Sequence, residues 1–233
     1  MSHLGILAAG LAVTLFTGAT AFALGPEVPL ANQSAESGAA SDDGLAATFI
    51  PGWATSGVPT VVRYGTSGPF PVRTVEVPGL NDQLFVGGPA PGLATLIQTA
   101  VIPEEALSVI DQGNGAVFAS ARLGGWQSDS DSSRVVVEVL DEHGGILASV
   151  IVGPVTAADR GGATVLMKLY QSMAAPIGSR SVIVRLELYG VDGAYNNALA
   201  DDIHVRIEFP DPVLPTTWGR IKLGEWSANG ASL

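Results

Sequence analysis

The chain has 233 residues and a formal net charge of -11, and this acidity argues against nucleic-acid binding, which requires a basic surface. The absence of cysteine excludes disulfides, thiolate metal sites and a cysteine nucleophile. Only 14% of the residues are charged, whereas 29 glycines and 15 prolines are present, and this composition favours one domain of short β-strands joined by turns.

An apolar segment begins the chain. Residues 4–24 contain no charged side chain and include Ala21-Phe22-Ala23, a small-x-small pattern at which a signal peptidase cuts. We therefore expect residues 1–23 to be a helical signal peptide and the protein to be secreted to the extracellular space. Residues 4–24 are also long enough to span a bilayer. An uncleaved membrane anchor is therefore the alternative, and it would be the only contact with a membrane.

Between residues 58 and 209, apolar and polar side chains alternate as in strands, with glycine and proline turns between them. Pro103, Glu104 and Glu105 predict a short surface helix that ends near Asp111, because proline and acidic residues suit a helix N-terminus. About nine strands at this spacing predict an all-β antiparallel sandwich or jelly roll. The predicted strands are residues 58–64, 83–86, 94–101, 116–123, 134–140, 146–152, 164–170, 181–189 and 202–209.

The clearest pattern lies in residues 195–209, where a polar turn leads into the last predicted strand. Asp201 and Asp202 stand where the turn becomes strand. The alternation ends after Phe209, so we expect residues 24–209 to form the sandwich domain and residues 210–233 a linker and short C-terminal tail. Ile203, Val205, Ile207 and Phe209 are predicted to face the core, and Asp202, His204, Arg206 and Glu208 to face the opposite side.

Five short motifs stand at residues 32–38, 51–57, 61–65, 153–160 and 195–203. They read NQSAESG, PGWATSG, VVRYG, GPVTAADR and YNNALADDI. In their order and spacing they resemble exported bacterial proteins with a galactose-binding-like domain, which are relatives of the jelly-roll carbohydrate-binding modules. The resemblance implies a sandwich of eight or nine strands with a structural calcium ion near the chain ends.

The same resemblance assigns the calcium ligands to Glu36 and to Asp201 or Asp202. The residues themselves also favour such a site, because Asn196, Asn197 and the two aspartates concentrate oxygen atoms, and calcium takes six to eight oxygen ligands. The first and last strands of an antiparallel sandwich are often neighbours, which would bring Glu36 within reach. The alternative is that these are turn residues, since Asn and Asp tolerate left-handed backbone.

Two tryptophans are candidates for stacking on a sugar ring. Trp126 belongs to the polar loop 125–133, and Trp53 follows a proline-glycine turn. The alternative, favoured for both, is packing: over the sandwich edge for Trp126 and in the core or at its rim for Trp53. Asp129 and Asp131 look like part of a calcium loop, but the glycine and glutamate of an EF-hand are missing, so we expect a solvated loop.

The residues give little support to catalysis. The chain lacks the nucleophile-elbow, metalloprotease and phosphate-loop motifs, and His143 and His204 are expected to be ordinary exposed residues. We therefore predict a non-catalytic binding module for a carbohydrate or another cell-surface polymer. The alternative is a structural or adhesive extracellular protein that makes protein-protein contacts without binding sugar. A hydrolase with scattered carboxylates is the third hypothesis.

Overall fold

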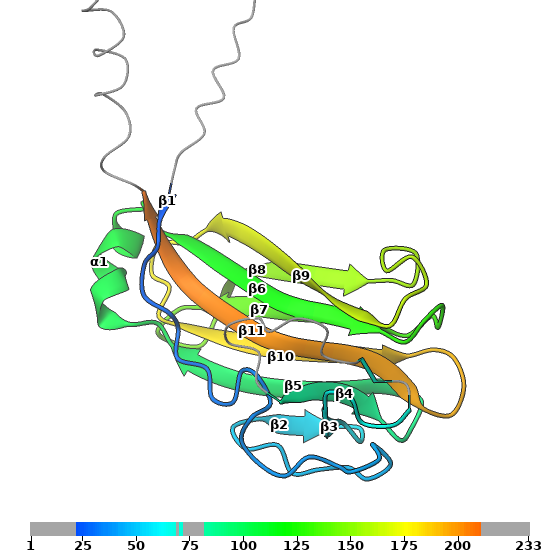
Figure 1. Ribbon diagram of the computed structural model, residues 1–233. Coiled ribbons are helices and arrows are strands. Elements are labelled where there is room, and N and C mark those ends of the chain that lie inside the picture. The colour runs from blue at the N-terminus through cyan, green and yellow to red at the C-terminus, as the bar shows by residue number, and fades with distance from the viewer. Residues whose placement is uncertain (1–21, 69, 72–81, 211–233) are drawn as a thin grey trace, which may run out of the picture. The chain divides into compact units, whose positions relative to one another are not determined.

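Two antiparallel β-sheets lie face to face and form a sandwich, with one short helix at one end (Figure 1). The structure is a computed structural model and describes residues 22–68, 70–71 and 82–210. One sheet has the order β3-β4-β11-β6-β9, with β1 also paired to β11, and the other has the order β2-β5-β10-β7-β8. The elements are β1 (Phe22–Ala23), β2 (Ala54–Ser56), β3 (Thr60–Arg63), β4 (Gln83–Gly88), β5 (Gly92–Val101), α1 (Glu104–Asp111), β6 (Ala116–Gly125), β7 (Ser132–Leu140), β8 (Ile146–Val155), β9 (Val165–Ala174), β10 (Ser181–Gly190) and β11 (Asn196–Pro210).

The all-β antiparallel sandwich predicted from the sequence is confirmed, and so is the short helix. The expected number of eight or nine strands is too low, because eleven strands occur among the described residues. The additional strands β1 and β2 contain two and three residues, too few to give an alternating pattern. The predicted signal peptide and C-terminal tail lie outside the described residues, apart from residues 22, 23 and 210. Within the described ranges, no helix is long and apolar enough to cross a bilayer.

β11 lies at the centre of its sheet, and its pairing is irregular at two places: between Asn196 and Leu199 against β4, and at a bulge between Asp201 and His204 against β6. Asp201 pairs with Arg122 of β6 and His204 pairs with Ser120, so three steps along β11 match two steps along β6. Asp202 has a φ of 53°, the left-handed backbone that is common at such bulges. One extra residue moves every later side chain to the other face of the sheet.

Burial on the two sides of the bulge follows this change. The predicted alternation after Asp202 is confirmed, but the polar turn expected before Asp201 is wrong, because β11 begins at Asn196 and continues through both aspartates. Even-numbered side chains face the core before the bulge and odd-numbered ones after it. The fully buried core-facing residues are Ala198, Ala200, Ile203, Val205 and Ile207.

The main core lies between the two sheets. Leu186, at the middle of β10, has Leu96 of β5 and Val135 of β7 as its register neighbours. All three side chains are buried in one apolar cluster to which both sheets contribute. Burial of apolar surface from both sheets is therefore the main stabilising contribution to the sandwich.

A second, smaller apolar cluster covers part of the outer face of the first sheet. Leu199 belongs to it and alternates along β11 with core-facing neighbours. Tyr195 packs against this cluster, edge to face with the ring of Phe70 at a centroid distance of 6.3 Å. The cluster therefore fixes the start of β11 from outside. Its buried members are Val62, Phe70, Leu84, Val86 and Leu199.

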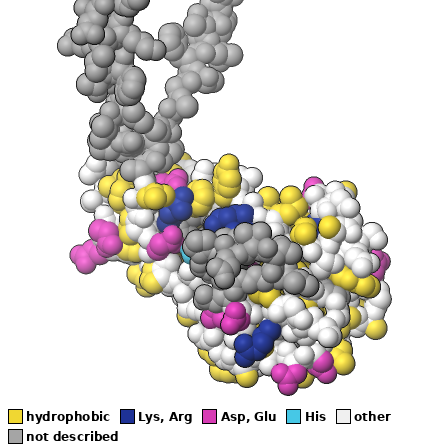
Figure 2. All heavy atoms as spheres, in the orientation of Figure 1, with side chains coloured by type: hydrophobic (Ala, Val, Ile, Leu, Met, Phe, Trp, Pro, Cys, Tyr) yellow, Lys and Arg dark blue, Asp and Glu magenta, His cyan; other side chains and the backbone are white. Residues whose placement is uncertain are grey.

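The first sheet also carries a stack of aromatic and basic side chains. The rings of Phe118 and Tyr170 are stacked with centroids 5.8 Å apart, and the Arg206 guanidinium lies 3.8 Å from the centroid of the Phe118 ring. Arg206 is also ion-paired with Glu208 at 2.7 Å. Figure 2 shows that acidic and basic side chains occur in small groups on the face in view. Contacts such as those of Arg206 with Phe118 and Glu208 are local interactions between neighbouring side chains.

Leu186→Ala should destabilise the fold by about 2–5 kcal/mol, because it leaves a cavity in a close-packed core. Urea unfolding of the purified protein measures this loss. Val101→Ala is the matched control, since Val101 lies on β5 with 71% of its surface exposed and should change stability by less than ~0.5 kcal/mol. Equal losses for the two variants would contradict the described core.

Candidate functional site

The segment that contains Glu36 forms a tight turn against β11. The Asn32 side chain holds this turn, because its Oδ1 accepts from the Ser37 N–H at 2.8 Å and its Nδ2 donates to the Ser37 carbonyl at 3.1 Å. The backbone N–H of Ile203, just after the bulge, donates to the carbonyl of Gln33 at 3.1 Å. The structure therefore brings the first motif of the chain to the two aspartates of the last, as the sequence predicts.

Glu36 and Asp201 lie close together in a region with little access to water. The Glu36 carboxylate accepts from the backbone N–H of Gln83 at 2.9 Å, and the side-chain oxygen of Gln83 is buried without a hydrogen-bond partner. Asp201 is fully buried and accepts from the Tyr64 hydroxyl at 2.6 Å. Burial, followed by the negative charges of Asp202 and Glu36, raises the pKa of Asp201 to about 7.

Asp202 has a different environment although it is the next residue. Its carboxylate lies 2.6 Å from His204 Nε2, 3.3 Å from Lys168 Nζ and 3.4 Å from Arg122 Nε. Burial alone would raise its pKa, but the hydrogen bond and positive charge of His204, together with Lys168, hold the pKa of Asp202 below its usual value. In the described part of the chain, Asp201 has no such ion pair. An added cation would therefore balance the charge of Asp201, whereas the charge of Asp202 is already balanced by basic side chains.

The atoms around Asp201 match the ligand chemistry of calcium. No group of three His, Cys, Asp or Glu side chains among the described residues is placed to hold a metal ion, so carboxylates alone do not build the site. Glu36, Asp201 and the unpartnered oxygen of Gln83 nevertheless offer only hard oxygen atoms. Calcium accepts carboxylate, amide and backbone oxygens in one flexible coordination sphere. The donor set therefore fits this ion.

A buried carboxylate joins two loops at one end of the sandwich. Asp131, at the end of the loop that follows β6, is fully buried. It accepts hydrogen bonds from the backbone N–H groups of Val191, Asp192 and Asn197, the last at 2.6 Å. The expectation of a solvated loop is therefore wrong for Asp131, because its carboxylate replaces water with backbone donors from the loop between β10 and β11.

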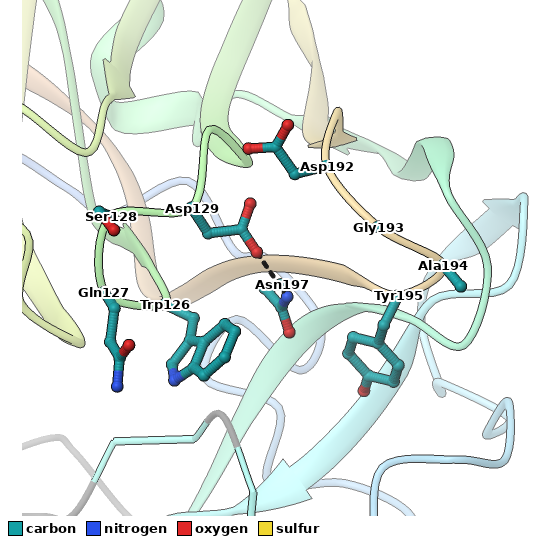
Figure 3. A pocket seen from close by; sticks show the side chains of 9 residues that line it. All are labelled: Trp126, Gln127, Ser128, Asp129, Asp192, Gly193, Ala194, Tyr195 and Asn197. Carbon is teal, nitrogen blue, oxygen red and sulfur yellow. Dashed lines mark hydrogen bonds between the residues drawn. The ribbon is translucent and has the colours of Figure 1, made fainter.

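An open cleft lies where these two loops meet (Figure 3), with a volume of about 440 Å³. Trp126, which is 37% exposed, and Tyr195 line it, with Asn197 between them. Asn197 Nδ2 donates to Asp129 at 2.7 Å, whereas its Oδ1 is buried without a partner. We call this site the Trp126 cleft; its lining residues are Trp126, Gln127, Ser128, Asp129, Asp192, Gly193, Ala194, Tyr195 and Asn197.

The cleft continues into an apolar extension. Trp126, Tyr195 and Asn197 also line a neighbouring hollow, in which Leu45 and Phe70 supply apolar surface. The Tyr195 hydroxyl donates to the carbonyl of Gly44 at 2.8 Å, so its ring is fixed between the two hollows. An apolar lining with few polar groups is typical of small-molecule sites.

The two tryptophans predicted as ligand contacts have different positions. Trp126 lines the cleft, whereas Trp53 is 6% exposed and belongs to the core. Its indole N–H donates to the carbonyl of Asn32 at 3.1 Å, and its ring meets Phe85 edge to face. Trp53 therefore occupies the core position that the sequence favours. The sequence does not single out Tyr195 as a site residue, although an aromatic residue within the polar stretch before β11 is a signal of that kind.

Comparison with known proteins concerns the fold. No protein-family model matches this chain. No curated protein matches it either. The C-terminal family 22 carbohydrate-binding module of Clostridium thermocellum Xyn10B is 16% identical with a TM-score of 0.39, over 80% of this chain and 100% of that one. A family 35 carbohydrate-binding module from the same organism is 9% identical with a TM-score of 0.33, over 66% of this chain and 90% of that one.

Larger proteins share this likeness. The enzymatically active domain of bacteriophage CBA120 tailspike protein 4 is 15% identical with a TM-score of 0.45, over 77% of this chain. This chain spans only 21% of that structure and 27% of an MgGH51 α-L-arabinofuranosidase. All of these likenesses have TM-scores below 0.5 and identities of 16% or less. The β-sandwich itself follows from the strand order of this chain.

The pair of His204 and Asp202 should make stability depend on pH. The hydrogen bond that His204 Nε2 donates to the Asp202 carboxylate raises the pKa of His204 above its usual value of 6.5. The stability that protonated His204 contributes is therefore fully present below about pH 6.5 and is lost as the pH rises through the folded-state pKa. The lowered pKa of Asp202 keeps its carboxylate charged throughout this range.

Urea unfolding of the wild type and of His204→Gln should therefore show a free-energy difference that shrinks by roughly 1–2 kcal/mol between pH 6 and pH 8.5. His143→Gln is the matched control, because the His143 side chain is 84% exposed, and its difference from the wild type should stay flat. Parallel curves for the two variants would contradict the described ion pair.

Proposed function

We propose that this protein is a non-catalytic glycan-binding module whose ligand lies in the Trp126 cleft, and that its sandwich holds a structural calcium ion at Glu36 and Asp201. One observation carries the glycan proposal. An unpartnered amide oxygen of Asn197 lies between two aromatic side chains at the floor of an open cleft. A buried acceptor without a donor costs free energy, and a ligand that donates a hydrogen bond there removes that cost.

A sugar ring fits this arrangement chemically. Its C–H faces are apolar and can lie against Trp126 or Tyr195, while its hydroxyl groups can donate to Asn197 and to the Asp129 carboxylate. Asp129 and Asn197 are already joined by a hydrogen bond, so both polar groups are fixed before a ligand arrives. Fixed polar groups beside exposed aromatic surface favour binding, because little conformational entropy is lost.

The cleft carboxylates favour binding over hydrolysis. A glycosidase needs one carboxylic acid with a raised pKa to protonate the leaving group. Asp192 instead accepts from the backbone N–H of Ser130 at 2.8 Å, and this hydrogen bond lowers its pKa. The carboxylate of Asp129 accepts a hydrogen bond from Asn197 Nδ2. These contacts suit groups that accept hydrogen bonds from a ligand.

Trp126→Ala should weaken glycan binding by about ten-fold or more, because an exposed tryptophan at the centre of a binding site often contributes over 1.4 kcal/mol. A glycan array followed by calorimetry on the best ligand measures this effect. Tyr170→Ala is the control, since Tyr170 is 69% exposed on β9 and does not line the cleft. If no glycan binds the wild type, or if both variants lose binding equally, the cleft is not a glycan site.

The calcium proposal rests on uncompensated burial of charge. Asp201 is fully buried beside Glu36, and among the described residues it has no basic partner within 4 Å. A divalent cation would offset both negative charges, and the free side-chain oxygen of Gln83 could coordinate it. Because Glu36 lies between β1 and β2 and Asp201 lies on β11, the last strand, the ion would tie two distant parts of the chain together.

Calcium should raise the melting temperature over that measured with a chelator, by roughly 5–10 °C at a hundred-fold excess over its dissociation constant. Asp201→Asn and Glu36→Gln should abolish the calcium-dependent increase. Glu142→Gln, whose side chain is 73% exposed, is the matched control and should keep it. An equal melting temperature of the wild type with calcium and with chelator would contradict the proposal.

A further inference from the structure

The Trp126 cleft is rich in hydrogen-bond acceptors, and the described residues add no basic side chain to its lining. Asp129 and Asp192 line it, and Asp43 lines its apolar extension. None of the residues that line the two hollows is a lysine, arginine or histidine. The charged side chains that the described residues contribute to the cleft are therefore all carboxylates.

The nearest buried cation is directed away from these carboxylates. Arg160 is 5% exposed, and its Nη2 donates to the backbone carbonyls of Gln127 and Asp129 at 3.1 Å each. Its other hydrogen bonds also go to backbone oxygens. Arg160 therefore supports the loop from behind, and the Asp129 side chain is left without an ion pair in the described part of the chain.

The two carboxylates of the cleft lie next to each other. Figure 3 shows the side chains of Asp129 and Asp192 on one side of the pocket, with Trp126 and Tyr195 on the other. A positive group placed against the two carboxylates would be attracted by both. The aromatic faces opposite would attract the same positive group.

A second observation points independently to a ligand in this place. The Asn197 side chain is 7% exposed, and its Oδ1 has no hydrogen-bond partner. Its Nδ2 is directed to Asp129, so the oxygen points the other way, toward the space between Trp126 and Tyr195 (Figure 3). The Asn197 oxygen therefore lacks a donor that a ligand can supply, and the two carboxylates can accept further hydrogen bonds beside those from Asn197 and Ser130.

The spacing of these groups fits an organic cation better than a metal ion. Among the described residues no three carboxylate or imidazole groups converge as a metal ion requires. A volume of about 440 Å³ is also suited to a sugar residue and not to a bare ion. An ammonium group has three donors that can reach separate acceptors, and it can be carried on a ring that stacks on the aromatic side chains.

We propose that the Trp126 cleft is selective for glycans with a free, protonated amino group, such as oligomers of glucosamine, over neutral and acidic glycans. This inference rests on the proposed glycan-binding function and names the chemical class of its ligand. In the bound state the ammonium group donates to Asp129 and Asp192. A ring hydroxyl donates to Asn197, and the sugar ring lies against Trp126.

The test is a matched series of hexasaccharides measured by calorimetry at low salt, at a pH where the amine is protonated. Cellohexaose, the N-acetylglucosamine hexamer and the glucosamine hexamer share one β-1,4-linked backbone and differ at C2. We expect the glucosamine hexamer to bind at least about ten-fold tighter than the other two, and the difference to shrink at high salt. Oligogalacturonate should bind weakest, because the cleft repels its carboxylates.

Asp129→Asn and Asp192→Asn should reduce the preference for the amine over cellohexaose to about two-fold or less, because each removes one of the negative charges that face the ammonium group. The protein carries a net charge of -11, so a non-specific attraction for cations is tested separately. Glu105→Gln removes an exposed charge on α1 and should keep the full preference, whereas Trp126→Ala should lose it.

Three results would overturn this inference. The first is binding of all three hexamers with equal affinity, which would leave the glycan-binding function intact and remove only the selectivity. The second is a preference that survives both Asp→Asn variants, which would make it non-specific. The third is calcium that competes with the glucosamine hexamer for the cleft, which would make the occupant a metal ion. Absence of binding by every glycan would instead remove the proposed function itself.

Discussion

The irregular pairing of β11 is the constraint on which both candidate sites depend. Its register shifts between Asn196 and Leu199 against β4, and again between Asp201 and His204 against β6. The first shift contains Asn197, which lies at the cleft. The second contains Asp202 and follows Asp201, so two consecutive aspartates stand in the middle of a central strand, where water has little access.

Three buried carboxylates of this acidic protein are stabilised in three ways. Asp202 is surrounded by basic side chains, and Asp131 accepts three backbone N–H groups. Asp201 has the Tyr64 hydroxyl and one backbone donor, and no described basic side chain is ion-paired with it. A buried carboxylate is costly until its charge is balanced. The charges of Asp131 and Asp202 are balanced by protein atoms, whereas that of Asp201 is the reason for the calcium proposal.

Much of the fold could be predicted from the sequence, because local patterns report it directly. Alternation of apolar residues located nine strands, and the acids after Pro103 located α1. The predicted ligand contact of Trp53 is wrong, because Trp53 lies in the core, the alternative that the sequence favoured. The grouping of the first motif with Asp201 came from the family resemblance and not from alternation. The bulge could not be predicted, since it depends on pairing with β6 and has no signature within β11 itself. The same limit applies to Asp131, whose donors come from a different loop.

The sequence by itself determined an all-β antiparallel sandwich without disulfides, and it named Glu36, Asp201 and Asp202 as one group, with Trp126 as an exposed aromatic candidate. Those conclusions depend on period, composition and motif order, which are properties of neighbouring residues. Only the tertiary structure separated Asp201 from Asp202, because their partners come from other strands. Only the tertiary structure joined Trp126 and Asp129 to Asn197, which is 68 positions beyond Asp129 in the chain. A cleft between two loops depends on which strands pair. No single stretch of the sequence determines that pairing, because the paired residues are far apart in the chain.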